Sequence, residues 1–140
     1  GYRNARYERF GWASARLDDV ANYLPSRATA AMVATLSGRR TRGVWRITKR
    51  FARRHPSPNA GWCEAAYAAS LGLTLGGRNT YGDRVEDRSL LGDGAAPTSA
   101  DIAGATRLTG RVVQTATACA MALAVGMNTV ARALRRQSRP

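Results

Sequence analysis

The stretch VVQTATACAMALAVGMNTVA (Val112–Ala131) carries no charged residue over twenty positions. Twenty residues of α-helix reach about 30 Å, which is the thickness of the hydrocarbon core of a bilayer. Ala116, Ala120 and Ala124 recur every four residues, and such a stripe of small side chains allows close contact between membrane helices. The stretch therefore predicts a membrane-spanning helix. Because it contains only one leucine, a buried helix of a soluble bundle stays open as the alternative.

The residues on either side predict where this helix begins and ends. Thr98 follows a proline and precedes Asp101 by three positions, which is the T-x-x-D form of a capping box. We expect one helix from about Ser99 to about Leu134, so that residues 97–140 form a long C-terminal helix with a basic tail. The arginines of that tail suit a helix C-terminus and a cytoplasmic location. They are Arg132, Arg135, Arg136 and Arg139.

Residues 1–38 are expected to form a helix followed by an apolar segment. The helix has an apolar face, because Ala13, Leu17, Val20 and Leu24 fall at helical spacing. The apolar segment is interrupted by Pro25 and Arg27, and its uninterrupted part, 28–38, is too short to span a bilayer. It is read as half of a broken membrane helix or as an interfacial segment.

Residues 39–54 form a basic segment with eight cations and no acid. Val44, Ile47 and Phe51 can share one face of a helix here. Two interpretations are equally consistent with this pattern: a helix lying on an anionic membrane surface, or a solvated basic linker. Both place the segment on the cytoplasmic side.

The whole chain has a formal net charge of +13, and 21 of its 22 cations are arginine. Such a charge predicts anionic partners, and arginine favours bidentate contacts to phosphate and carboxylate. A nucleic-acid-binding module is the alternative from another class, but the basic segment offers only Trp45 and Phe51 for base stacking, so we expect no nucleic acid partner. A single histidine excludes a His-rich metal site, and Cys63 and Cys119 form no C-x-x-C pair. The chain opens at Gly1 without a signal-peptide pattern and is expected to be a piece of something longer.

The run HPSPNAGWCEAA (His55–Ala66) concentrates unusual residues at a predicted helix start. Ser57 reads as the N-cap and Pro58 as the first helical residue, in a helix that runs to about Leu71 and stops at Gly72. The free amides of its first turn, from Asn59 to Gly61, predict an anion site with His55 at the entrance.

Three carboxylates are candidates for chemistry. Glu64 lies in the second turn of this helix, either as a partner of the helix dipole or as a ligand or base. Asp19 is spaced for an ion pair with Arg16, and Asp18 with Asn22 is the better geometric pair for Mg²⁺, since adjacent helix positions diverge by about 100°.

The segment LGLTLGGRNTYGDRVEDRSLLGDG (Leu71–Gly94) contains six glycines and predicts turns around a Gly-rich loop or a short hairpin. With the helix before it, this loop makes up residues 55–96. Its GGRNTYG string lacks the strand–turn–helix context of a dinucleotide fingerprint, and the chain has neither a GxxxxGK[ST] phosphate loop nor a G-x-S-x-G nucleophile motif.

Three strings in this order closely resemble the CobD/CbiB family of cobalamin biosynthesis: YERFGWASARLDDVANYLPSRATA (Tyr7–Ala30), HPSPNAGWCEAA and LGLTLGGRNTYGDRVEDRSLLGDG. The resemblance runs from about Gly1 to Leu108 and covers the family's C-terminal portion, so a further N-terminal half with more membrane helices is expected as a partner. Cys63, Asp83 and Ser89 depart from the family pattern. The expected fold is an all-α, integral membrane helical protein (partial), with residues 1–140 forming the C-terminal portion of a single domain and the Gly-rich loop or short hairpin between helices.

The resemblance implies an adenosylcobinamide-phosphate synthase in the bacterial inner membrane. Such an enzyme uses ATP and Mg²⁺ to join a carboxylate of adenosylcobyric acid, a corrinoid, to aminopropanol or its phosphate. Membrane lipid and further copies of the chain are expected partners as well. The alternative is a catalytically incomplete membrane-bound fragment or partner subunit of that enzyme.

Under this resemblance we assign roles to three groups of residues. The catalytic group, in which His55 moves a proton from the attacking amine or donates to a phosphate, is His55, Asn59 and Glu64. The metal ligands are Asp18 and Asp19. The substrate and phosphate contacts are Arg16, Ser57, Gly61, Gly77, Arg78, Asn79, Tyr81 and Arg84.

Overall fold

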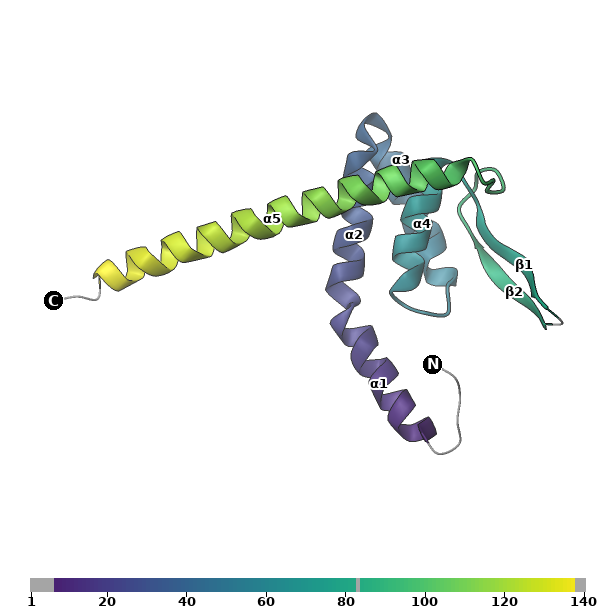
Figure 1. The fold of residues 1–140 in the computed structure, drawn as a ribbon, viewed down its shortest axis with the longest axis horizontal. Helices are drawn as coiled ribbons and strands as arrows, with labels where there is room; N and C mark the ends of the chain where they lie inside the picture. The colour runs from purple at the N-terminus through teal and green to yellow at the C-terminus, as the bar shows by residue number, and fades with distance from the viewer. Residues whose placement is uncertain (1–6, 83, 138–140) are drawn as a thin grey trace.

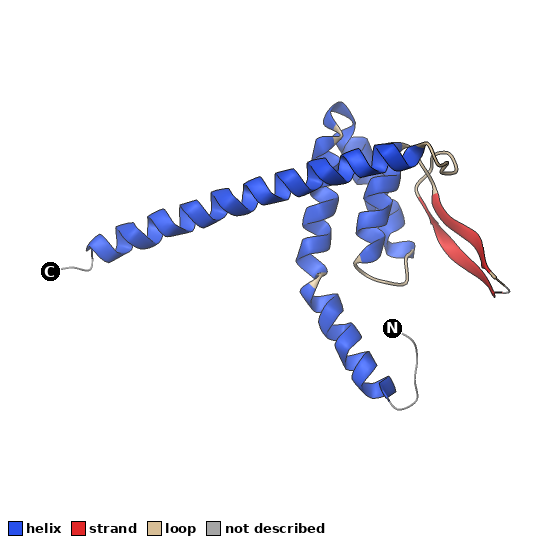
Figure 2. Cartoon of the chain, viewed as in Figure 1, coloured by secondary structure: helices blue, strands red, loops and turns tan. Residues whose placement is uncertain are grey.

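The computed structural model describes residues 7–82 and 84–137, and it is mostly helical (Figures 1 and 2). The long helices are α1 (Glu8–Ala21), α2 (Tyr23–Leu36), α3 (Thr41–Phe51), α4 (Ala60–Leu71) and α5 (Asp101–Gln137). Two 3₁₀ turns, η2 (Gly38–Arg40) and η3 (Ala52–Arg54), flank α3. The strands β1 (Leu75–Tyr81) and β2 (Arg84–Leu91) form one antiparallel hairpin. The expected helical fold with a short hairpin is therefore confirmed, and the molecule is all-α apart from these two strands.

Helices α2, α3 and α4 form the compact part of the molecule. Ala30 and Val33 of α2 and Ala66 of α4 have no exposed surface, and they share one cluster with residues of α5. The small alanine side chains let the helices approach closely, so that interdigitating side chains fill the space between them. This compact part supports the loop that carries the candidate site.

The basic segment contributes a packed helix, so the interpretation of residues 39–54 as a solvated linker is wrong, while their position on an anionic membrane surface stays a prediction. Val44 and Phe51 of α3 are 3% and 6% exposed and pack against α2 and α4. Thr48 is fully buried on the same face, and its hydroxyl donates to the Val44 carbonyl at 2.7 Å. The segment is thus no linker, and its apolar face is used inside the protein. Only the cationic face is exposed.

The N-terminal segment is helical on both sides of a break at Asn22. Pro25 is the third residue of α2, where a missing N–H leaves no helical hydrogen bond unmade, so α2 continues through it to Leu36. The break therefore lies at Asn22 and not at Pro25, and residues 28–36 belong to one uninterrupted helix. The role of residues 28–38 as half of a broken membrane helix or as an interfacial segment stays a prediction. The apolar face of α1 remains uncovered, since Leu17 and Val20 are 72% and 74% exposed.

Helix α4 begins at Ala60, two residues later than predicted. Pro58 and Asn59 form a turn, and the Ser57 hydroxyl accepts from the backbone N–H groups of Asn59 and Ala60 at 3.4 and 3.3 Å. The predicted stop is confirmed: Gly72 has φ 71° and ψ 34°, a left-handed conformation that glycine adopts without steric cost.

The hairpin is anchored at its base and projects away from the helices (Figure 1). Leu91 at the end of β2 is 1% exposed and packs with Phe51, Ala52 and Ala65. A register shift between Leu75 and Gly77 places Gly76, with φ 95°, against the Ser89 carbonyl. A side chain at Gly76 would collide with that carbonyl, and Gly77 has φ 82°, which a residue with a side chain rarely adopts.

Helix α5 lies across α2 and α4 near its start and then extends alone (Figure 1). Its predicted capping box is confirmed, because the Asp101 carboxylate accepts from the Thr98 backbone N–H at 2.8 Å and from the Thr98 hydroxyl at 2.7 Å. Leu108 and Val112 are buried against the compact part. Beyond residue 116, every described side chain of the helix is exposed.

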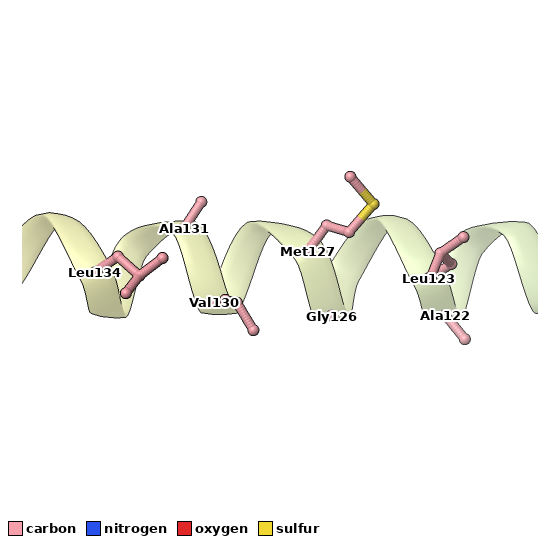
Figure 3. A pocket seen from close by; sticks show the side chains of 7 residues that line it. All are labelled: Ala122, Leu123, Gly126, Met127, Val130, Ala131 and Leu134. Atoms are coloured by element: carbon pink, nitrogen blue, oxygen red, sulfur yellow. The ribbon is translucent and has the colours of Figure 1, made fainter.

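Among the described residues, α5 is the one helix long and apolar enough to cross a membrane, over Asp101–Arg132. Only 11% of its most apolar 18-residue window is buried, which argues against the core helix of a soluble bundle. Figure 3 shows that the apolar side chains of α5 project from the helix with no other element drawn beside them; the labelled residues are Ala122, Leu123, Gly126, Met127, Val130, Ala131 and Leu134. The surface that they line belongs to α5 alone.

Candidate functional site

A pocket with polar walls, which we call the polar pocket, opens between the start of α2, η3 and the loop before α4. Its volume is about 390 Å³. Its lining combines two arginines and a histidine with aromatic and proline side chains. The lining residues are Tyr23, Arg27, Ala52, Arg53, His55, Pro56, Pro58 and Trp62.

Arg27 of the polar pocket contacts two aromatic rings and the loop before α4. Its guanidinium carbon lies 3.6 Å from the centroid of the Tyr23 ring and 5.1 Å from that of Trp62. Nη1 donates to the Asn59 side-chain Oδ1 at 2.7 Å, and Nη2 donates to the Pro58 carbonyl at 3.2 Å. Cation–π contacts and hydrogen bonds thus fix the plane of the guanidinium between two aromatic rings.

Asn59 links the loop to the N-terminal helices. It is 7% exposed, its Oδ1 accepts from Arg27 and from the Ser26 hydroxyl (3.2 Å), and its Nδ2 donates to the Asp19 carbonyl at 2.8 Å. A buried amide with donors and acceptors paired in this way stabilises the fold and has little capacity left for a ligand. The geometry gives Asn59 the role of holding Arg27.

His55 and Glu64, predicted as catalytic groups, do lie together. The backbone N–H of Ser57 donates to His55 Nδ1 at 3.0 Å, and His55 Nε2 lies 3.7 Å from Glu64 Oε1. His55 Nδ1 also lies 3.3 Å from the Ser57 carbonyl oxygen, so the backbone of Ser57 holds the ring through Nδ1. This arrangement leaves Nε2 as the ring nitrogen that faces Glu64.

The predicted anion site at the helix start is not formed as expected. Two of its amides, those of Asn59 and Ala60, face the Ser57 hydroxyl. Gly61 is buried, and a Cβ there would collide with the Ala52 carbonyl oxygen and lie 2.6 Å from His55 Cβ. Gly61 therefore serves close packing of η3 on α4, and Ser57 serves as a cap.

The two aspartates of α1 are engaged separately. The Arg16–Asp19 ion pair is confirmed at 3.4 Å, and Asp18 Oδ1 accepts from the Asn22 amide at 2.8 Å. Among residues 7–82 and 84–137, no three His, Cys, Asp or Glu side chains gather where they could hold a metal ion.

The predicted substrate residues of the Gly-rich loop lie on the hairpin. Gly77, Arg78 and Asn79 belong to β1, with Arg78 paired in register with Asp87 and the Asn79 amide donating to the Gly77 carbonyl at 3.2 Å. Of these three, none lines the polar pocket. The side chains of Tyr81 and Arg84 lie outside those that the structure describes.

Trp62 belongs to the sequence run that predicts the site and Arg53 stands just before that run, whereas Tyr23 and Arg27 of the pocket come from α2 and were not predicted. The available signal for Arg27 is that it is a lone cation in an apolar segment. The pKa of the Cys63 thiol on α4 depends on charges at this pocket. Burial raises this pKa, the Glu64 carboxylate raises it further, and the Arg27 guanidinium lowers it.

Comparisons with known proteins agree with the resemblance in the sequence. Residues 1–109 match the family model described as CobD/Cbib protein. The chain is 52% identical over 117 residues to the Cobalamin biosynthesis protein CobD of Mycobacterium tuberculosis (strain ATCC 25618 / H37Rv), covering 81% of this chain and 37% of that protein. It is 44% identical over 133 residues to the protein of the same name from Geobacter metallireducens, covering 93% of this chain and 41% of that protein.

The chain thus spans about two fifths of the length of these two relatives. No solved structure gives a significant match. The matched residues include α1–α4, the hairpin and the first turns of α5, and therefore the whole polar pocket. By this match the chain belongs to the CobD/CbiB family, whose relatives named here are cobalamin biosynthesis proteins.

Proposed function

We propose that this chain contributes to an adenosylcobinamide-phosphate synthase, which uses ATP to form an amide bond during cobalamin biosynthesis. The observation that carries the proposal is the polar pocket, which lies in the family-matched segment and presents Arg27, Arg53 and His55 without an acidic residue in its lining. Cations and hydrogen-bond donors of this kind stabilise the charge that develops on a transferring phosphoryl group.

The proposed reaction has two steps, with ATP and the amine as substrates. A carboxylate oxygen of adenosylcobyric acid attacks the γ-phosphorus of ATP, which forms an acyl phosphate and releases ADP. The nitrogen of aminopropanol or its phosphate then attacks the acyl carbon, inorganic phosphate leaves, and the nitrogen loses a proton. Both steps move negative charge onto phosphate oxygens, which is where the pocket cations would act.

In this proposal some pocket residues bind the phosphate, and others orient them or exclude water. Arg27 is fixed by Tyr23 and Asn59, so it can meet phosphate oxygens with little loss of conformational freedom. His55 is held through Nδ1 and would donate a hydrogen bond through Nε2, in the second of its two predicted roles, that of a phosphate donor. Trp62, Pro56 and Pro58 provide apolar walls that limit access of water.

Magnesium was expected on Asp18 and Asp19, but these carboxylates do not fit a shared metal site in the described arrangement. Asp18 is bonded to Asn22 and Asp19 is paired with Arg16. We therefore derive no step through a metal ion from this chain.

The proposed location is the bacterial inner membrane. The unburied helix α5 supports a membrane location, since Asp101–Arg132 is long and apolar enough to span a bilayer. Lipids around α5 and further copies of the chain are the proposed partners there.

The second candidate is a catalytically incomplete membrane-bound fragment or partner subunit of that enzyme. The chain spans 37% and 41% of the relatives from M. tuberculosis and G. metallireducens, and in this candidate turnover needs the other family segments.

A chimera tests the proposal with those segments present. We would replace the 117 matched residues of the M. tuberculosis relative by the corresponding residues of this chain, and incubate membranes with adenosylcobyric acid, ATP, Mg²⁺ and either amine. Mass spectrometry should detect adenosylcobinamide or its phosphate only when ATP is present. His55→Ala and Asn59→Ala should abolish product, whereas Arg46→Gln on the exposed face of α3 should not. Absence of product from a membrane-integrated chimera, with an active parent protein, would refute the proposal.

A further inference from the structure

Arg27 is a part-buried cation whose recorded acceptors are all uncharged. They are the Tyr23 and Pro58 carbonyls, the Ser26 hydroxyl and the Asn59 amide oxygen. Among the ion pairs of the described residues, none involves Arg27. Removing a charge from water without a counter-ion is costly, so such a group suits a site that an anion completes.

The hydrogen bonds of Arg27 leave two N–H donors of its guanidinium available. The two N–H groups of Nη1 are shared among three acceptors, and Nη2 donates to the Pro58 carbonyl. A guanidinium has five N–H donors, so Nε–H and one N–H of Nη2 remain for a ligand. Charge-assisted donors of this kind bind phosphate oxygens strongly.

A second arginine and a histidine lie near these donors. Arg53 and His55 line the same pocket, and none of its eight lining residues is acidic, although Glu64 lies 3.7 Å from His55 Nε2. Stacking at 3.6 Å on Tyr23 holds the guanidinium before a ligand arrives, which lowers the entropic cost of binding.

We propose that Arg27, supported by Arg53 and His55, binds the phosphate group of a small phosphate ester in the polar pocket, and that Asn59 is the positioning residue for Arg27. The inference rests on the proposed function in its choice of ligand, and it names the phosphate-binding group of that site. Phosphate is preferred over carboxylate because a dianion is matched by two guanidinium groups, whereas a carboxylate monoanion is satisfied by one.

The test measures binding by the whole 140-residue chain in an uncharged maltoside detergent. Calorimetric titrations use aminopropanol phosphate and inorganic phosphate, with acetate as the carboxylate probe and phosphatidylglycerol in mixed micelles as the lipid probe. We expect Arg27→Gln to weaken binding of aminopropanol phosphate by at least about tenfold. Arg27→Lys should weaken this binding as well, because lysine keeps the positive charge but lacks the planar set of N–H donors of the guanidinium.

Arg46→Gln is the matched control, since it removes the same charge from the exposed face of α3 and should leave the affinity within about twofold. Equal weakening by Arg46→Gln and Arg27→Gln would show a general charge effect and overturn the proposal. Acetate binding as tightly as the phosphates, or binding of phosphatidylglycerol alone, would overturn the assignment of a soluble phosphate ester.

Asn59→Ala provides the readout for positioning. It should weaken phosphate binding while circular dichroism shows retained helix content, and unchanged affinity would refute the positioning role. A second readout is the titration of Cys63, because a phosphate bound to Arg27 offsets the charge that lowers the pKa of that thiol. Saturating phosphate should therefore raise the pKa in the wild-type chain and leave it unchanged in Arg27→Gln.

The two proposals fail in distinguishable ways. Phosphate binding is measured without turnover, so an inactive chimera leaves this result intact. If the chain does not bind phosphate and the chimera stays active with Arg27→Gln, the phosphate site proposed at Arg27 is refuted. The proposed ligase activity then stands.

Discussion

Arg27 connects the fold and the candidate site through one side chain. Its hydrogen bond to Asn59 joins residues that are 32 positions apart, and its stacking on Tyr23 lies within one helical turn. The local contact follows from helix geometry, since residues four apart share a face. The distant contact exists only after α2 and the loop before α4 have packed together.

Gly61 is the residue at which a small change should disturb the site most directly. In Gly61→Ala the added Cβ collides with the Ala52 carbonyl, which is backbone and cannot rotate away. We expect a loss of about 1–3 kcal/mol in the free energy of unfolding, as for other overpacked positions, and displacement of His55. Thermal or denaturant unfolding in detergent measures the loss. Gly43→Ala is the control, because nothing lies within 4 Å of a Cβ built there. Equal stability of the two variants would contradict the packing role.

The pKa of the Cys63 thiol depends on charged residues around the polar pocket, so a titration of this thiol measures their effect. Burial raises the pKa of Cys63, Glu64 raises it further and Arg27 lowers it. Since the thiolate is the reactive form, alkylation should reach half its maximal rate at a higher pH than for a free cysteine. Glu64→Gln should move this midpoint down, and Arg27→Gln should move it up. Iodoacetamide rates in a Cys119→Ser background provide the measurement; shifts in the opposite directions would show that these charges do not act on the thiol.

At the scale of elements, the structure separates what local sequence signals predict from what packing decides. The capping box at Thr98, the stop at Gly72 and the glycine-rich hairpin were predictable, because each depends on hydrogen bonds or torsion angles within a few residues. The start of α4 was misplaced by two residues, since Ser57 caps a turn before the helix and not its first residue.

The basic segment and the candidate site show what the sequence could not provide. The apolar face of α3 was recognised, but whether lipid or protein covers it depends on α2 and α4, which meet it only in the folded chain. Of the predicted site, His55 and Glu64 do come together. The packing roles of Asn59 and Gly61 could not be predicted, because their partners, Arg27 and Ala52, come from other elements; their functional roles stay predictions.

The membrane role of α5 can be tested at its centre. Leu123 lies in the middle of the uncharged stretch and is 66% exposed. An arginine at the centre of a membrane helix costs about 2.5–3.5 kcal/mol of insertion free energy, and the cost falls toward the ends because long side chains reach the interface. Leu123→Arg should therefore reduce the membrane-integrated fraction after carbonate extraction much more than Leu134→Arg. Equal extraction of the two variants would argue that α5 does not span.

At the scale of the whole molecule, α5 separates two basic regions. The compact part contacts α5 only up to about residue 116, and the uncharged stretch Val112–Ala131 continues away from it (Figure 1). This stretch covers about 30 Å along the helix axis, which is the full hydrocarbon core. If α5 is the one crossing, the cations of α3 and the arginines of the tail lie on opposite sides, and the expectation that both are cytoplasmic cannot hold.

Two physical arguments then favour opposite orientations. The tail carries Arg132 and Arg135 close to the end of the span, and the positive-inside rule would place it in the cytoplasm. The polar pocket lies in the compact part, however, and the ATP-dependent reaction proposed for it needs the nucleotide of the cytoplasm. We give precedence to the argument from ATP. The charges of a short tail orient short loops, whereas the side on which a folded part of the chain lies is largely independent of them.

We therefore predict that the compact part faces the cytoplasm and the tail faces outward. Asp93→Cys marks the exposed loop before α5 and Leu134→Cys marks its far end, each in a chain with Cys63→Ser and Cys119→Ser. In intact cells a membrane-impermeant maleimide should label Leu134→Cys, and it should label Asp93→Cys only after permeabilisation. Labelling of Asp93→Cys in intact cells would place the polar pocket away from ATP and refute both the orientation and the ligase proposal. Protection of both positions would require a second crossing of the membrane, and would restore a cytoplasmic location for both basic regions.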